Sequence, residues 1–131
     1  MIRSLFIAVG TICFSILISV SSAFSKVEGD TIILGSSISL TGKYATNGLH
    51  TQRGYDYAVD VINSKGGVKV GGKSYKLDVK YYDDESTPAR GAQLIERLIQ
   101  QDGIQFTLGP YSSGMTKAIA PVVEKFKVPM I

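Results

Sequence analysis

The chain has few of the residues that common catalytic sites and disulfide frameworks need. Its 131 residues include one cysteine, Cys13, and one histidine, His50. A single cysteine excludes a disulfide within the chain. His50 falls early in a predicted helix, where a surface position is the ordinary outcome, and no serine has an obvious histidine partner. These shortages argue against a hydrolase built on a serine and a histidine.

Nucleotide-binding signatures are missing as well. No Gly-x-Gly-x-x-Gly follows the first predicted strand, and no phosphate-binding loop is present. The run Asp83-Asp84-Glu85 offers the oxygen ligands that magnesium prefers, but a solvated turn, with Asp or Ser capping the next helix, is the favoured interpretation. We therefore expect a protein that is not an enzyme and that holds no metal or cofactor.

The charge of the chain is too small to indicate a polyanionic partner. Fourteen Lys and Arg residues face 11 Asp and Glu residues, a formal net charge of +3. The lysines are scattered rather than gathered on one helix face, so the sequence does not favour nucleic-acid binding.

The first 25 residues have the layout of a secretory signal peptide. Arg3 precedes an apolar run over residues 5–20, and the small residues Ser21, Ser22 and Ala23 suit cleavage after Ala23 or Ser25. The alternative, a membrane anchor, needs about 20 apolar residues, which this run barely approaches. Ile12 stands before Cys13 where a lipoprotein signal requires a small residue. The sequence predicts export of residues 26–131 to the periplasm.

Beyond the leader, strand-like and helix-like patterns alternate. The β-branched run 31–38, the alternating run 75–82 and the apolar run 104–108 predict strands, and 128–131 starts a fourth. Alternation over 75–82 indicates a strand buried on one face, near a sheet edge. Caps and glycines predict three helices: from Thr46 or Asn47 to Ser64, from Thr87-Pro88 to 101, and from 115 to 126. Residues 68–74 form a hairpin-like loop around Gly71-Gly72.

This order predicts an α/β fold with a parallel sheet, right-handed crossovers and helices on both faces. Ligands of such sheets bind outside the carboxyl ends of the strands, at a point where the strand order reverses. Two turns, over residues 40–47 and 109–115, lie at that end. Because the fourth strand ends the chain, we expect residues 26–131 to be a truncated piece of a longer protein.

The turn at 109–116 is the strongest candidate binding site. It leads from a buried strand into a helix whose first backbone amides lack internal partners and favour an anion such as a carboxylate. Ser112 and Ser113 add hydroxyl groups, and Gly109 and Gly114 allow close approach. The alternative is that a serine here only caps the helix.

Six short motifs in this order resemble the periplasmic substrate-binding proteins of branched-chain amino acid ABC importers. They are ISLTG at 38–42, AVDVINSKGGV at 58–68, YDD at 82–84, GPYSS at 109–113, APV at 120–122 and VPMI at 128–131. The resemblance implies a type I periplasmic binding protein with two lobes, which traps its ligand between them and delivers it to a membrane permease. Only the first part of the first lobe would be present here.

The resemblance also implies roles for single residues. Ser113 matches the serine whose hydroxyl and amide hold the ligand carboxylate, and Tyr111 and Ser112 match its neighbours. Asn47 falls where family members often place an aromatic residue against the ligand side chain. The residues that grip the ammonium group lie beyond this chain, so only the carboxylate half of the site is expected.

Three alternatives stay open at this point. Relatives of this family bind amides, urea or aromatic carboxylates. The same lobe also forms the ligand-binding part of extracytoplasmic sensors. If the truncated chain acts alone, we expect no measurable amino-acid binding, because the wall at Ser113 would be open to water.

Overall fold

The structure is a computed structural model that describes residues 27–131. The predicted signal peptide, residues 1–25, lies outside the described residues. Between residues 27 and 131, no helix has the length and apolar character needed to cross a membrane.

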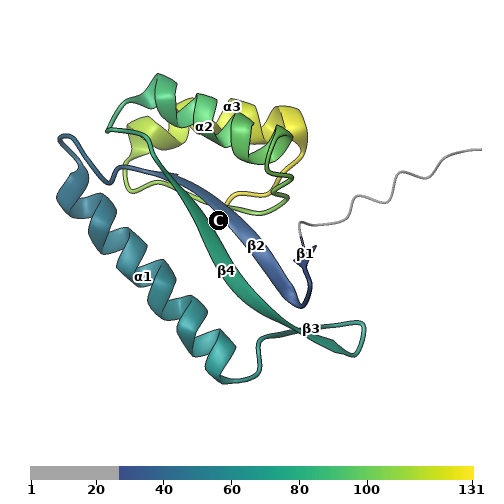
Figure 1. Ribbon diagram of the computed structural model, residues 1–131. Coiled ribbons are helices and arrows are strands. Elements are labelled where there is room, and N and C mark those ends of the chain that lie inside the picture. The colour runs from purple at the N-terminus through teal and green to yellow at the C-terminus, as the bar shows by residue number, and fades with distance from the viewer. Residues whose placement is uncertain (1–26) are drawn as a thin grey trace, which may run out of the picture.

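Strands and helices alternate as the sequence predicts (Figure 1). The elements are β1 (Val27–Glu28), β2 (Thr31–Ile38), α1 (Ala45–Ser64), β3 (Val68–Val70), β4 (Lys73–Asp83), α2 (Pro88–Gln100), β5 (Thr107–Leu108) and α3 (Ser113–Phe126). The predicted strand 31–38 and the end of the first helix at Ser64 are confirmed. Thr87 and Pro88 begin α2 as predicted, with proline at a position where its missing N–H costs no hydrogen bond.

The sheet is organised around β2. It pairs in parallel with β4 along its full length and with β5 at Gly35 and Ser36 on its other side. Met130 forms a parallel bridge to Thr107, so the last residues add to the sheet beyond β5. β2, the first of these three parallel strands in the chain, therefore lies between β4 and β5. The order of the strands in the sheet reverses beside β2. This confirms the predicted parallel α/β fold.

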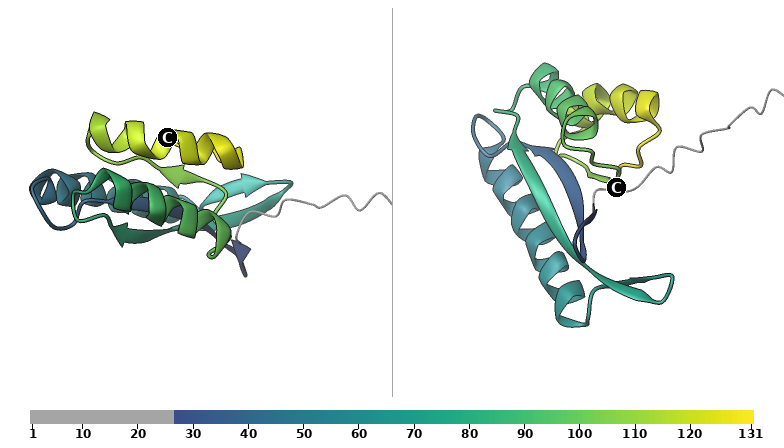
Figure 2. Two further views of the ribbon diagram at one scale, coloured as in Figure 1. Left: turned by 90° about the horizontal axis from the view of Figure 1, so that it is seen from above. Right: turned by 45° about the vertical axis from the view of Figure 1, so that its right-hand side comes forward.

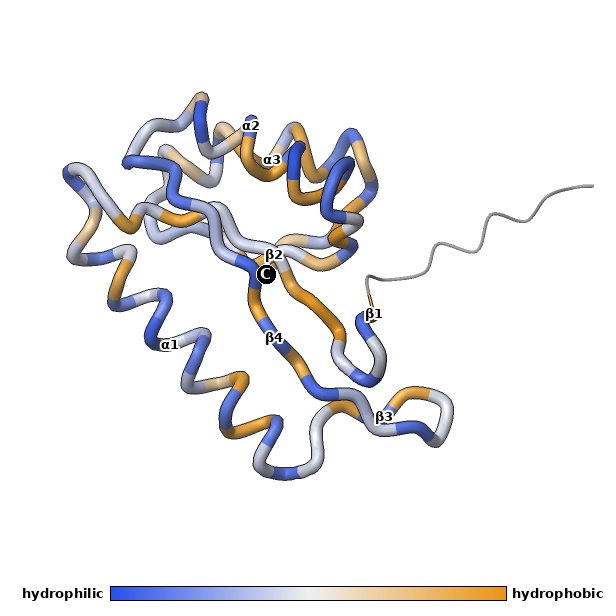
Figure 3. Tube along the Cα trace, in the orientation of Figure 1, coloured by the Kyte–Doolittle hydropathy of each residue, from blue (hydrophilic) through white to orange (hydrophobic). Residues whose placement is uncertain are grey.

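Two short antiparallel strands were not predicted as strands, although the hairpin-like loop predicted around Gly71-Gly72 is confirmed. β1 pairs with the start of β2, and β3 pairs with the start of β4 through a turn at Gly71-Gly72. Both glycines have positive φ, 58° and 84°, as a two-residue hairpin turn requires. Because β3 covers only the first three residues of β4, the rest of β4 lies at the sheet edge, as its alternating pattern indicates (Figure 3).

The helices cover opposite faces of the sheet, α1 on one and the paired α2 and α3 on the other (Figures 1 and 2). Neighbouring residues of β4 show this directly. The Tyr81 hydroxyl donates to Asp56 of α1 at 2.7 Å, whereas the Tyr82 hydroxyl donates to Asp102, just after α2, at 3.0 Å. Successive strand residues point to opposite faces, so each tyrosine reaches a different layer.

The core lies between β2 and the α2–α3 pair. Its buried members are apolar residues of the sheet, of both helices and of the connection after α2: Ile33, Ile95, Leu98, Ile104, Ile119 and Val123. Gly35 allows this packing, because a Cβ there would lie 2.8 Å from the Ile104 side chain. The packing of Ile104 against the sheet therefore depends on a glycine in the central strand.

Several sequence expectations differ from the structure, among them the start of the third helix, which is Ser113 and not residue 115. The first helix begins at Ala45, with Tyr44 as N-cap, and not at Thr46 or Asn47. The Tyr44 amide donates to the Ser86 hydroxyl at 3.0 Å, so a residue from the distant β4–α2 loop binds the backbone at the start of the helix. Local sequence carries no sign of that partner.

The third strand is shorter than the predicted 104–108. Only Thr107 and Leu108 form it, because the Ile104 amide donates to the Leu98 carbonyl at 2.9 Å and closes the end of α2. The side chain of Ile104 is buried in the core although its backbone lies in a turn. Hydrophobic periodicity does not distinguish such a residue from one in a buried strand.

Few side chains of the first helix are buried. Leu49 and Ala58 are exposed, and Gly48 is the one buried residue of α1. The reason is that α1 packs mainly along one edge strand, β4, which offers less surface than α2 and α3 offer each other.

Candidate functional site

The two turns predicted to form the site lie together at the carboxyl ends of β2 and β5. The rings of Tyr44, in the first turn, and Tyr111, in the second, have centroids 6.5 Å apart. The Tyr55 hydroxyl of α1 donates to the Gly109 carbonyl at 2.8 Å. These two contacts join α1 to the turn after β5 across the point where the strand order reverses.

Asp83, the last residue of β4, holds the first turn in place. Its carboxylate accepts hydrogen bonds from the Leu40 amide at 2.9 Å and from the Thr41 hydroxyl at 2.7 Å, among others. Burial acts to raise the pKa of Asp83, but these hydrogen bonds outweigh it and hold the pKa below its ordinary value. An ionised Asp83 therefore fixes the loop that leads into α1.

Asp84 is fully buried, so the interpretation of 83–85 as a solvated turn is wrong at this residue. The Ser39 hydroxyl donates to its Oδ1 at 2.6 Å and the Ser86 amide at 2.8 Å, while Oδ2 has no partner in the part of the chain described. Burial raises the pKa of Asp84. Nor does Asp84 cap α2, whose N-cap Thr87 has no side-chain cap bond.

The carboxylates of 83–84 therefore tie two loops together. Within residues 27–131, no three His, Cys, Asp or Glu side chains gather in a group that could hold a metal ion.

Gly48 sets the position of the first turns of α1. A Cβ at this residue would lie 1.8 Å from the Ser39 carbonyl oxygen, so only glycine allows the helix to touch the loop so closely. With Gly48 packed against the loop, the side of the helix that carries Thr46, Asn47 and His50 turns away from it.

The second turn leads into α3 through Ser112. Ser112 is the N-cap, and its hydroxyl accepts a hydrogen bond from the Met115 amide at 3.2 Å. Ser113 is the first residue of the helix and is exposed, and its hydroxyl makes no hydrogen bond to any other described residue. The structure thus gives Ser112 the role of cap that local sequence favours and leaves the Ser113 hydroxyl available.

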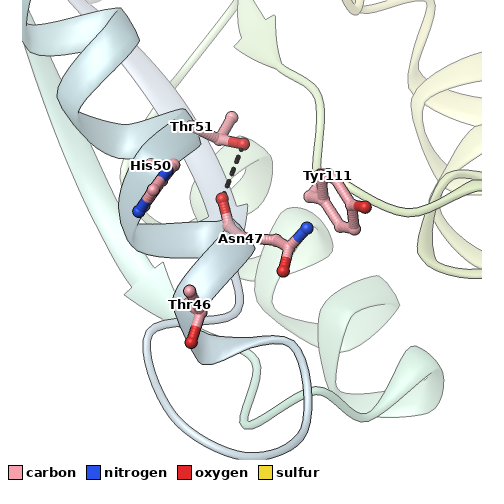
Figure 4. A pocket seen from close by; sticks show the side chains of 5 residues that line it. All are labelled: Thr46, Asn47, His50, Thr51 and Tyr111. Atoms are coloured by element: carbon pink, nitrogen blue, oxygen red, sulfur yellow. Dashed lines mark hydrogen bonds between the residues drawn. The ribbon is translucent and has the colours of Figure 1, made fainter.

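An open hollow of about 430 Å³ lies between α1 and the second turn (Figure 4). Asn47 and Tyr111, both predicted site residues, line it, and Figure 4 shows the Asn47 amide pointing toward the Tyr111 ring. Ser112 and Ser113 follow Tyr111 in the chain but do not line the hollow.

Three lining residues were missed by the sequence analysis: Thr46, His50 and Thr51. His50 and Thr51 follow Thr46 by four and five residues, so all three lie on the same face of the helix as Asn47. His50, interpreted as a surface residue, is exposed but faces this hollow. The helical spacing from Asn47 was the signal that would have identified them.

Comparison with known families and proteins agrees with this architecture. A family profile described as "Periplasmic binding protein" matches residues 31–131. The Leu/Ile/Val-binding protein BraC3 of Rhizobium johnstonii is 32% identical over 111 residues, which cover 85% of this chain and 29% of that protein. The Leu/Ile/Val-binding protein homolog 3 of Brucella melitensis is 28% identical over 117 residues, 89% of this chain and 30% of that protein.

Solved structures show the same relationship. The substrate-binding protein LivJ of a branched-chain amino acid transporter from Streptococcus pneumoniae, in complex with isoleucine, superposes with a TM-score of 0.68 and 33% identity. A periplasmic binding protein type 1 from Bordetella pertussis superposes with a TM-score of 0.65 and 32% identity. The matches cover 76% and 77% of this chain but only 28% and 26% of those chains. The chain therefore spans less than a third of the length of these relatives.

Proposed function

This chain belongs to the periplasmic binding protein family, and from that premise we propose that it is part of the extracytoplasmic solute-binding component of an ABC importer. It binds a branched-chain or related amino acid between two lobes and delivers it to the membrane permease. Residues 26–131 form the N-terminal part of the first lobe, after a cleaved signal peptide, and act in the periplasm. The matches span 29% and 30% of the relatives, which supports a part of a lobe and not a whole two-lobed protein.

The observation that carries the proposal is the free start of α3 beside the meeting point of the two turns. Ser112 caps the helix through the Met115 amide, and the Thr116 amide donates to the Ser112 carbonyl at 2.9 Å. The amides of Ser113 and Gly114 have no hydrogen-bond partner in residues 27–131. Two free amides, the Ser113 hydroxyl and the positive end of the helix dipole together suit a ligand carboxylate.

Lobe closure supplies the rest of the mechanism. A carboxylate held at an open surface gains only about 1 kcal/mol from each hydrogen bond, because water competes. When a second lobe closes over the ligand and excludes water, the same contacts strengthen, and the closed form is the one that the permease recognises. The ligand shifts the protein toward that form because it binds it more tightly.

Isothermal titration calorimetry of the full-length mature protein tests this function. The panel holds leucine, valine, phenylalanine, asparagine, threonine, benzoate and a short aliphatic amide. Binding of an α-amino acid is the expected result. Binding of only benzoate or only the amide would keep the solute-binding role but replace the ligand class, and binding of no compound would contradict the proposal.

A further inference from the structure

We propose that the hollow between α1 and Tyr111 selects amino acids whose side chains carry a hydrogen-bonding group, with Asn47 and His50 as the specificity-determining residues. The inference rests on the proposed function, since it assigns a side-chain preference to the same amino-acid site. Within the branched-chain or related amino acids of the proposed function, it favours related amino acids with polar side chains over the aliphatic ones that the names of the relatives suggest.

The composition of the wall is the first observation. Four of the five residues that line the hollow come from the first two turns of α1, and each carries a hydroxyl, an amide or an imidazole. The fifth, Tyr111, contributes an aromatic ring, and the residue is 53% exposed. Among residues 27–131, no aliphatic side chain lines the hollow. An aliphatic ligand side chain would therefore meet polar groups on the α1 side.

The hydrogen-bonding state of the wall is the second observation. The Thr51 hydroxyl donates to the Asn47 carbonyl at 3.0 Å and is already occupied. The side chains of Thr46, Asn47 and His50 make no hydrogen bond to other described residues. Asn47 offers two N–H donors and one acceptor, and a neutral His50 offers one donor and one acceptor. The wall of the hollow thus has both hydrogen-bond donors and hydrogen-bond acceptors that no other described residue uses.

Water satisfies these groups while the hollow is open, but a bound ligand displaces that water. A polar group left without a partner after burial is costly, whereas a ligand amide or hydroxyl replaces the lost hydrogen bonds. A site that presents such groups discriminates strongly against an analogue of the same shape that lacks them. The balance therefore favours a polar side chain over an aliphatic one of equal size.

The charges near the wall do not oppose this. In the part of the chain that the structure describes, no acidic side chain lines the hollow, and the first turn of α1 has none. Asp56, further along α1, is engaged by the Tyr81 hydroxyl at 2.7 Å. A ligand amide or hydroxyl oxygen can therefore approach Asn47 and His50 without repulsion.

Two pairs of amino acids with nearly equal shape test the inference: asparagine against leucine, and threonine against valine. Calorimetric titration of the full-length protein should give a Kd at least about tenfold lower for the polar member of each pair. Equal or tighter binding of leucine and valine would overturn the inference while leaving the proposed function intact. Absence of binding by all four, and by the other amino acids of the panel, would overturn both.

Substitutions then test the named residues. Asn47→Leu and His50→Leu should each lower the polar-to-aliphatic preference, whereas Arg53→Leu, on the same helix but outside the hollow, should leave it unchanged. A preference that survives both hollow substitutions would show that neither residue sets the specificity. Circular dichroism checks that each variant folds, and the ligand pairs on the unsubstituted protein remain decisive if one does not.

Discussion

Tyr44 and Tyr111 lie with their ring planes inclined at 54° and their centroids 6.5 Å apart, a tilted aromatic contact between the two turns that follow β2 and β5. Such a pair contributes about 1 kcal/mol beyond the area it buries. It lies at the reversal of strand order, where ligands of parallel sheets bind. The candidate site is therefore assembled from two loops that are far apart in the chain.

Tyr55→Phe should loosen this assembly. The change removes the hydrogen bond to the Gly109 carbonyl, which is 2.8 Å long, and leaves that carbonyl without the donor. We expect the free energy of unfolding of the full-length protein to fall by about 1 kcal/mol, measured by urea denaturation. Tyr57→Phe is the control, because Tyr57 is 72% exposed and its loss should change nothing measurable. Equal effects of the two changes would contradict the assigned role of Tyr55.

Two glycines of α1 form a matched pair for substitution by alanine. At Gly48 a Cβ would lie 1.8 Å from the Ser39 carbonyl oxygen, whereas at Gly54 nothing lies within 4 Å. Gly48→Ala should destabilise the protein by about 3 kcal/mol, because helix and loop must separate. Gly54→Ala should stabilise it by up to about 1 kcal/mol through helix propensity alone. Thermal unfolding of both variants measures the contrast, and a harmless Gly48→Ala would show that the close approach is not needed.

The two adjacent serines of the second turn should separate stability from binding. Ser112→Ala removes the helix cap and should cost about 1 kcal/mol of stability. Ser113→Ala should leave stability unchanged, because its hydroxyl has no partner in the described residues, but should weaken amino-acid binding by about 1–3 kcal/mol. Urea denaturation measures the stability of each full-length variant, and calorimetry measures its affinity for the amino acid. Unchanged affinity in Ser113→Ala would mean that its hydroxyl does not meet the ligand.

Asp84 should make the stability depend on pH. Burial raises its pKa above the ordinary value of 3.8, so the folded state binds this proton more tightly than the unfolded chain does. The stabilisation it contributes is full below that ordinary value and is lost as the pH rises through the raised pKa. The asparagine side chain in Asp84→Asn cannot ionise, so this variant does not lose stability for that reason as the pH rises.

The stability of Asp84→Asn relative to the unsubstituted protein should therefore improve with rising pH. The expected gain is about 1.4 kcal/mol for each unit by which burial raises the pKa. Urea denaturation of both proteins from about pH 3 to about pH 8 measures it. Curves that stay parallel over this range would show that Asp84 keeps its ordinary pKa in the fold.

Much of the fold follows from local pattern. The β-branched run of β2, the Thr87-Pro88 start of α2 and the glycines after α1 each act through their own backbone preferences, so their elements are found where expected. Two predicted element boundaries are wrong. Ile104 was predicted to begin a strand but lies in the turn after α2, and the first helix begins after Tyr44, whose amide donates to the distant Ser86 hydroxyl. Both failures occur where a tertiary contact outweighs the local preference.

The candidate site, too, depends partly on local sequence and partly on tertiary contacts. The sequence by itself determined that the strands run parallel with helices between them, which places the two turns at one end of the sheet, because the alternation of strands and helices depends on residues close in the chain. Only the tertiary structure decided what holds them, since Asp83 and Asp84 reach partners more than 40 residues away. The wall formed by Asn47 and His50 also depends on it, because the close packing of Gly48 against Ser39 sets which helix face looks into the hollow.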